Sequence, residues 1–455
     1  LFMCFKKFLI RYMLIAMLVT LCMSSSILAV NDTATDDDQV NGSSTGLDIY
    51  AESGILIDAE SGKTLYEKNS TTRMYPASTT KLVTAILTLD NCNLDDIAKV
   101  SYYSVHSVPY SYSIANLQPG EELTIRELLY SLMVASANDS AYVLAQYIVN
   151  KGNGYDTGSS SSAKAKFNED IATFSDMMNS KAKELGCVST NFINPNGIHN
   201  ENHYSSAYDL ALIGKAAYSN STLRTIASTV TYTLPNNDVY TGDSRIFNTT
   251  NLLLRKSRKG YYEYANGLKT GYTDAAGFCI IASAEKNGVN LIAVILNSDN
   301  TTNSTTSREA DCKRLFEYGF NNYSYSNLIS SGDVATNITI ANGKSDCKSL
   351  DLTASSDIRA LVHSGEAIDV TPEISITKSS APISSGEVVG TISYTLDGIT
   401  YNSDLIATHD VYSASYLNFI LILLCTFALL LFLVTIFSEK SKKATRKKNY
   451  NRRIY

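Results

Sequence analysis

Cysteines that could build a disulfide framework or a zinc ribbon are lacking in this 455-residue chain. It holds eight cysteines, but none stands in a C-x-x-C pair. Cys4, Cys22 and Cys425 lie in hydrophobic segments, and the remaining cysteines are an odd number at wide spacings. A disulfide scaffold or a cysteine metal site is therefore the minor alternative, and we expect these thiols to be buried as small apolar side chains.

The chain also lacks the H-E-x-x-H pattern of zinc peptidases. His199 and His203 stand four apart with Glu201 between them, which gives H-x-E-x-H instead. The preceding Asn194-Pro195-Asn196-Gly197 predicts a turn and not the interior of a helix. We expect these histidines to make loop contacts, with zinc as the alternative, and we predict no metal and no other cofactor.

Charge is scarce and unevenly distributed. Charged residues make up 18% of the chain and hydrophobic residues 44%, which excludes a disordered chain and is typical of a folded protein with membrane segments. The formal net charge is −6, although both ends of the chain are basic. The part between them is therefore strongly acidic, and we expect no binding to nucleic acid.

Two hydrophobic segments predict a protein of the cell membrane. Residues 1–29 have basic residues before an apolar run, which predicts a signal peptide, with an uncleaved anchor as the alternative. Residues 416–437 are long enough, at about 1.5 Å per residue, to cross a hydrocarbon core of about 30 Å, with a buried core helix as the alternative. Residues 438–455 are basic and predict a cytoplasmic tail, so the chain before the single-pass anchor would be extracytoplasmic.

The patterns between these segments predict two domains. Residues 30–46 are polar and predict a linker. Residues 47–325 have hairpin patterns at both ends, which predicts an α+β domain whose first and last strands share one antiparallel sheet flanked by helices. Residues 326–410 alternate in short runs between turns, which predicts a small all-β domain. The helical patterns within the first domain include residues 78–89, 125–149 and 174–185.

The first motif with chemical potential is Ser78-Thr79-Thr80-Lys81, an S-x-x-K. Residues three apart share a helix face, so the Lys81 amine can reach the Ser78 hydroxyl and take its proton. The pattern alone is weak, because the chain repeats it at other serines. These are Ser161, Ser180, Ser283, Ser345 and Ser375.

Two further motifs follow at Ser136-Ala137-Asn138, an S-x-N, and at Lys269-Thr270-Gly271, a K-T-G. Lys269 could face an anion, and Gly271 would let the backbone approach a ligand. Of the S-x-x-K serines, only Ser78 precedes both motifs, which is the order S-x-x-K, S-x-N, K-T-G of penicillin-binding enzymes. Each motif alone is a weak indication of function, but the three motifs in this order are a strong one.

The motifs and their surroundings resemble the low-molecular-mass penicillin-binding proteins of the D-alanyl-D-alanine carboxypeptidase family. The stretches that carry the resemblance are YPASTTK at 75–81, LQPGEEL at 117–123, VASAND at 134–139, FINPNG at 192–197, HYSSAYD at 203–209 and GLKTGYTD at 267–274. Residues 326–410 also resemble the C-terminal domain of that family. The resemblance implies the β-lactamase/transpeptidase-like fold.

The resemblance implies three catalytic residues. Ser78 would attack the carbonyl between two D-Ala residues and form an acyl-enzyme. Lys81 would be the base, and Ser136 would relay a proton to the leaving amine.

The resemblance also implies five substrate-binding residues. Asn138 would hold the substrate amide and Lys81. Lys269 and Thr270 would bind the terminal carboxylate, and Gly271 also counts among the substrate-binding residues. The backbone N–H groups of Tyr272 and of the nucleophile would form the oxyanion hole. Some family members have His in place of Tyr272, but a backbone donor survives that exchange.

The implied activity is that of a serine-type D-Ala-D-Ala carboxypeptidase, which removes the terminal D-Ala from peptidoglycan pentapeptides and is inhibited by penicillin. Its partners would be peptide stems that end in D-Ala-D-Ala, β-lactams and the cytoplasmic membrane. The alternatives are a β-lactamase or a transpeptidase of the same fold, or a non-catalytic sensor of β-lactams or cell wall. Ala137 replaces the Asp of the β-lactamase S-D-N, which disfavours a β-lactamase.

Overall fold

The computed structural model describes residues 47–298, 307–344, 348–414 and 417–451. The predicted signal peptide at 1–29 and the predicted linker at 30–46 lie outside the described residues. So do Cys4, Cys22 and Cys347.

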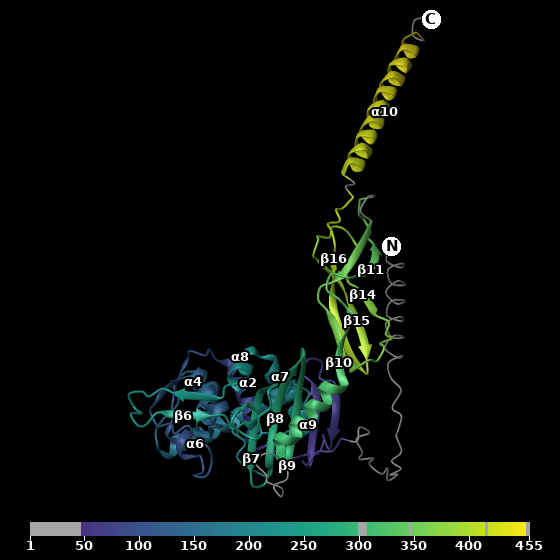
Figure 1. Cartoon of the computed structure of the whole chain (residues 1–455). Helices are drawn as coiled ribbons and strands as arrows, with labels where there is room; N and C mark the ends of the chain where they lie inside the picture. The colour runs from purple at the N-terminus through teal and green to yellow at the C-terminus, as the bar shows by residue number, and fades with distance from the viewer. Residues whose placement is uncertain (1–46, 299–306, 345–347, 415–416, 452–455) are drawn as a thin grey trace, which may run out of the picture. The chain divides into compact units, whose positions relative to one another are not determined.

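A five-stranded antiparallel sheet with the order β2-β1-β9-β8-β7 organises the first domain (Figure 1). Its strands are β1 (Ser53–Asp58), β2 (Thr64–Lys68), β7 (Ala265–Thr273), β8 (Gly277–Lys286) and β9 (Val289–Ser298). The first strand β1 pairs with the last strand β9, as the sequence predicted. Asn287 and Gly288 connect β8 to β9 with φ angles of 53° and 79°, as a two-residue hairpin turn requires.

Helices cover both faces of this sheet, and alternate residues of the central strands face two different cores. Ile281 and Val294 pack into a large core with α2, α4, α5, α6, α7 and α8. Ile280 and Ile295 pack into a second core with Phe316 of α9. This alternation follows from the two-residue period of a β-strand.

The helices are α2 (Lys81–Asn91), α3 (Tyr102–His106), α4 (Ile125–Val134), α5 (Asn138–Val149), α6 (Ser161–Glu184), α7 (Ala207–Ser219), α8 (Ser221–Ala227) and α9 (Ser307–Asn322). The short elements are β3 (Ile97–Lys99), β4 (Glu122–Thr124), β5 (Thr231–Leu234), β6 (Arg245–Asn248) and the 3-10 helices η1 (Ala77–Thr80) and η2 (Leu252–Leu254).

Two predicted helices differ from the structure at the motifs. The helix predicted at 125–149 is wrong, because α4 ends at Val134 and α5 begins at Asn138. Ser136 lies in the break with a φ of 58°, which a right-handed helix cannot accommodate. The helix predicted at 78–89 starts later, since Ser78 lies in η1 and the α-helix begins at Lys81.

The second part of the described chain is all β, as the sequence predicted. A five-stranded antiparallel sheet has the order β11-β12-β16-β15-β14, and β10 pairs with β13. Its strands are β10 (Tyr323–Ile329), β11 (Val334–Thr339), β12 (Ser349–Ala354), β13 (Ile358–His363), β14 (Glu373–Ile376), β15 (Val388–Leu396) and β16 (Ile399–Ala407). Leu350, Val389 and Leu405 are fully buried in its core.

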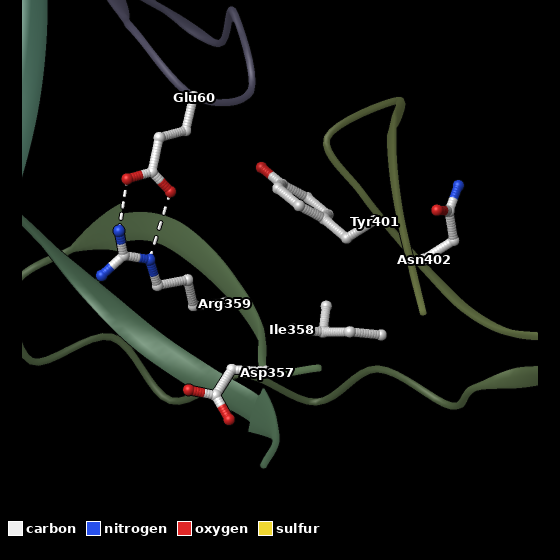
Figure 2. Close-up of a pocket in the computed structure, with 6 residues that line it drawn as sticks. All are labelled: Glu60, Asp357, Ile358, Arg359, Tyr401 and Asn402. Carbon is white, nitrogen blue, oxygen red and sulfur yellow. Dashed lines mark hydrogen bonds and ion pairs between the residues drawn. The ribbon is translucent and has the colours of Figure 1, made fainter. Parts of the chain in front are cut away.

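Polar contacts join the β1–β2 turn to this β-rich part. Arg359 pairs with both carboxylate oxygens of Glu60 (Figure 2), and Nζ of Lys63 lies 2.7 Å from Oδ2 of Asp397. A polar pocket of about 240 Å³ borders the Glu60–Arg359 pair. Its lining residues are Glu60, Asp357, Ile358, Arg359, Tyr401 and Asn402 (Figure 2). None of the predicted site residues lines this pocket, so it is separate from the predicted catalytic centre.

The last helix, α10 (Leu417–Asn451), contains one segment that is long and apolar enough to cross a membrane. The segment Phe419–Ala444 has 26 residues, and an 18-residue window within it has a mean hydropathy of 3.1. None of it is buried, so it is not the core helix of a globular domain. The segment is consistent with a membrane anchor.

Candidate active site

Lys81 is fully buried and points its amine at three oxygen atoms. Nζ lies 2.9 Å from Oγ of Ser78, 2.9 Å from Oδ1 of Asn138 and 2.6 Å from the carbonyl oxygen of Asn196. The 3-10 turn of η1 brings Ser78 and Lys81 together, because residues three apart align along such a turn. The structure therefore brings the S-x-x-K and the S-x-N into contact.

Burial lowers the pKa of Lys81 well below its ordinary value, and the positive charge of Lys269 lowers it further. The negative charge of Asp139 opposes this shift. A neutral amine has two N–H groups and one lone pair. It can donate to Asn138 and Asn196 while it accepts the proton of the Ser78 hydroxyl.

The turn that contains Ala77 and Ser78 is in close contact with Gly197. Ala77 has a φ of 47°, in the left-handed region that residues with a Cβ rarely adopt. Gly197 packs directly on it, since a Cβ built on Gly197 would lie 1.9 Å from the carbonyl oxygen of Ala77. The FINPNG stretch therefore supports the turn and supplies the Asn196 carbonyl to Lys81.

The S-x-N occupies the break between α4 and α5. Ser136 is buried in that turn, and Asn138 begins α5 with an exposure of 2%. Nδ2 of Asn138 donates to the carbonyl of Ser113 at 2.8 Å, which leaves Oδ1 to face Lys81. The orientation of this amide is thus set by an acceptor, the Ser113 carbonyl, on its nitrogen and by a donor, the Lys81 amine, on its oxygen.

The K-T-G lies on β7, the edge strand of the five-stranded sheet. Its inner neighbour is β8, where Thr270 pairs with Ile280 and Gly271 with Cys279. A Cβ on Gly271 would lie 2.9 Å from the backbone nitrogen of Ser78, so this strand passes directly beside the turn that carries Ser78. Glycine is required there for that close approach.

Lys269 is buried with an exposure of 1%, and its Nζ donates to the carbonyl of Thr270 at 2.9 Å. Burial lowers the pKa of Lys269 to about 7, and the charge of Arg308 contributes. A charged lysine amine has three N–H donors, so Lys269 retains donors for an anionic ligand beside its bond to Thr270.

Tyr272 follows the K-T-G with a side chain that is 47% exposed. Its hydroxyl donates to Oδ1 of Asp274 at 3.0 Å, and its ring lies 4.6 Å from that of Phe278. The side chain therefore lies at the surface, in contact with Asp274 after the end of β7 and with Phe278 on β8.

Two residues that the sequence did not single out also contact the K-T-G. Oγ1 of Thr250 lies 2.5 Å from Oγ1 of Thr270. Nη1 of Arg308, at the start of α9, donates to the carbonyl of Gly271 at 3.2 Å. Neither residue belongs to a motif, because both reach the strand from segments distant along the chain.

His203 makes internal contacts through both ring nitrogens. Nδ1 accepts the backbone N–H of Ile193 at 3.2 Å, so Nε2 carries the proton and donates to Oγ1 of Thr80 at 2.9 Å. Burial lowers the pKa of His203 to about 3, which keeps the ring neutral. His199 instead contacts the ring of Tyr75. Within the part of the chain that the structure describes, no group of three His, Cys, Asp or Glu side chains could hold a metal ion.

The described cysteines have free thiols, and Cys187, Cys279 and Cys312 are buried. Burial raises the pKa of Cys279 to about 11, so its thiol stays protonated beside the K-T-G. These three cysteines behave as small apolar side chains, as the sequence predicted.

Two protein families match different parts of the chain. The family described as D-alanyl-D-alanine carboxypeptidase matches residues 38–300. The family described as penicillin-binding protein 5, C-terminal domain, matches residues 323–414.

Individual proteins are similar over most of the chain. The D-alanyl-D-alanine carboxypeptidase DacF of Bacillus subtilis is 32% identical over 376 residues, which cover 81% of this chain and 88% of the relative. The structure of penicillin-binding protein 5 from Haemophilus influenzae matches with a TM-score of 0.60 and 25% identity, over 81% of this chain and 99% of the other. The Streptomyces K15 DD-transpeptidase matches with a TM-score of 0.51 and 35% identity, over 60% of this chain and 98% of the other.

Proposed function

The chain belongs to the D-alanyl-D-alanine carboxypeptidase family and is a serine-type D-Ala-D-Ala carboxypeptidase, and we propose that Ser78 is its nucleophile. The observation that carries this proposal is the buried Lys81 amine 2.9 Å from Oγ of Ser78. A hydroxyl needs a neighbouring base to become a nucleophile at neutral pH. The lowered pKa of Lys81 supports its role as that base.

In the proposed reaction, the Ser78 hydroxyl attacks the carbonyl carbon between the two terminal D-Ala residues while its proton passes to neutral Lys81. The C–N bond then breaks, and Ser136 relays this proton from Lys81 to the leaving amine, so Lys81 is neutral again. Free D-Ala departs, and an ester between the peptide and Ser78 remains. Water then attacks the ester carbonyl as it gives a proton to Lys81, and Lys81 passes this proton to Oγ of Ser78 as the C–O bond to Ser78 breaks.

Substrate binding is proposed for the residues on both sides of Ser78. The ammonium of Lys269 and the hydroxyl of Thr270 would hold the terminal carboxylate, and Asn138 would hold the peptide amide. The close passage of Gly271 beside the nitrogen of Ser78 supports an oxyanion hole made by the N–H groups of Ser78 and Tyr272.

The proposal is tested with the full chain in detergent, a peptide that ends in D-Ala-D-Ala, and labelled penicillin. We expect release of free D-Ala, and a label on Ser78 that is lost slowly. Both should disappear in Ser78→Ala. A stable label without peptide cleavage would contradict the proposal and favour a sensor. Rapid turnover of penicillin would point to a β-lactamase, and a new peptide bond to an added amine would point to a transpeptidase.

A single-pass anchor is proposed for residues 416–437, most of which lie in the apolar part of α10, with the catalytic domain outside the cytoplasm. The basic residues after position 437 support this orientation by the positive-inside rule. In sealed cells, an added protease should remove the catalytic domain and leave an epitope at the C-terminus intact. Protection of the catalytic domain instead would contradict the orientation.

A further inference from the structure

A buried carboxylate follows the S-x-N directly. Asp139 lies in the first turn of α5 and is 1% exposed. Its two oxygens accept the backbone N–H of Ala115 at 2.9 and 3.0 Å, and Oδ2 accepts that of Leu117 at 3.2 Å. Oδ1 also accepts the N–H of Ser140 at 2.9 Å. The carboxylate thus ties α5 to a segment more than twenty residues earlier.

That segment, residues 113–117, lies between α3 and β4 and is exposed at Ser113, Ile114 and Asn116. Ala115 and Leu117 are the two buried members of the segment, and they are the residues whose N–H groups Asp139 accepts. An exposed segment moves readily unless its backbone is held, because few apolar contacts restrain it. The carboxylate of Asp139 accepts these two N–H groups and so holds the backbone where the segment meets the core.

The same segment holds the side chain of Asn138. The Ser113 carbonyl accepts both the backbone N–H of Asn138 at 2.9 Å and its Nδ2 at 2.8 Å. With Nδ2 bound there, Oδ1 faces Nζ of Lys81 at 2.9 Å. If the carbonyl moved away, the amide could rotate and present N–H groups to Lys81, which would remove the acceptor that orients the amine.

We propose that Asp139 is a positioning residue for the carboxypeptidase reaction: it fixes residues 113–117 so that the Ser113 carbonyl holds Asn138 in the orientation that aligns Lys81 with Ser78. The proposal rests on the roles of Ser78 and Lys81 in the proposed function. Asp139 acts through two backbone segments and exchanges no proton with the substrate. A small misplacement of a catalytic group is sufficient to slow the chemical step strongly.

The test compares two isosteric substitutions in the full chain. Asp139→Asn places an NH₂ group against backbone N–H groups of residues 113–117. Asp311→Asn is the matched control, because Asp311 is also fully buried and its carboxylate accepts the N–H groups of Tyr50 and Ala51 at 3.0 Å each. Each variant is titrated to completion with labelled penicillin, so that kcat refers to functional sites only.

For Asp139→Asn we expect kcat per titrated site, and the rate of acylation by penicillin, to fall about tenfold or more, with KM within about threefold of the wild type. Asp311→Asn should unfold at a lower temperature and keep kcat within about twofold. Asp139→Glu, which keeps the charge but shifts its oxygens, should recover part of the lost rate. If Asp139→Asn loses only thermal stability, as the control does, the proposal is overturned.

Hydrogen exchange on the wild-type chain gives a second test that needs no variant to fold. The amides of Ala115 and Leu117 should exchange slowly, because both donate to a buried carboxylate. Exchange at the rate of free peptide would overturn the proposal.

If the wild type releases no D-Ala but is still acylated by penicillin, the proposed function fails, while the acylation rates of the variants still test the role of Asp139.

Discussion

Nζ of Lys81 lies 2.9 Å from Oγ of Ser78, although Ser78 belongs to a 3-10 turn and Lys81 to the α-helix that follows it. Ser78 is the second residue of this turn, and Lys81 is the first residue of the α-helix and is fully buried. Four consecutive residues therefore bring together a hydroxyl and a buried amine, which are the proposed nucleophile and base.

The first prediction concerns the need for a base that can lose its proton. Lys81→Arg keeps a positive charge, but a guanidinium stays protonated in proteins. We expect the acylation of Ser78 by penicillin and the release of D-Ala to fall by about 10²–10⁴-fold. Lys166→Arg, at an exposed lysine on α6, should leave both rates unchanged. Full activity in Lys81→Arg would show that another group takes the serine proton.

The second prediction concerns pH. The proposed reaction uses Lys81 in its neutral form, so kcat/KM should fall on the acid side as Lys81 gains a proton. Lys269 is proposed to bind the carboxylate in its charged form, and burial lowers its pKa to about 7, so kcat/KM should fall again as the pH rises through about 7.

The effect of the Arg308 charge on the pKa of Lys269 can be tested in the same pH profile. Arg308→Gln removes a charge that lowers the pKa of Lys269, so the alkaline limb of the profile should move to higher pH. The measurement is kcat/KM against pH for a peptide that ends in D-Ala-D-Ala. An alkaline limb at the same pH in both proteins would contradict the assignment of that limb to Lys269.

The third prediction concerns the close approach of β7 to the nucleophile. A Cβ on Gly271 would lie 2.9 Å from the nitrogen of Ser78, and 3.0 Å from both Cβ of Ala77 and the carbonyl oxygen of Pro76. Gly271→Ala should therefore displace the strand, at a stability cost of about 1–3 kcal/mol, and slow acylation. Gly154→Ala is the control, because a Cβ there meets nothing within 4 Å. Equal acylation rates in the two variants would argue against an oxyanion hole at this position.

The fourth prediction concerns Thr250, whose Oγ1 lies 2.5 Å from Oγ1 of Thr270. Thr250→Val removes the hydroxyl that orients Thr270, so KM for the peptide should rise about five- to tenfold, as the loss of one hydrogen bond of about 1 kcal/mol implies, with kcat little changed. Thr250→Ser keeps the hydroxyl and should behave as the wild type. A fall in kcat at constant KM would assign Thr250 to the chemical step instead.

Local patterns in the sequence determined much of this protein. The hairpin at Asn287 and Gly288, the apolar helix at Phe419–Ala444 and the pairing of Ser78 with Lys81 all depend on residues close together in the chain. The order of the three motifs, with the resemblance they carry, was enough to indicate the family. Periodicity and spacing report such features directly, since they involve one turn, one strand or one helix at a time.

Only the tertiary structure decided which other groups meet at the site. Asn196 reaches Lys81 from 115 residues away, and Arg308 and Thr250 reach the K-T-G from other segments. The break at Ser136 was hidden by a helical pattern that continues across it, because the apolar residues on both sides pack into the same core. Contacts of this kind arise from the packing of distant segments, which the pattern of a single sequence does not record.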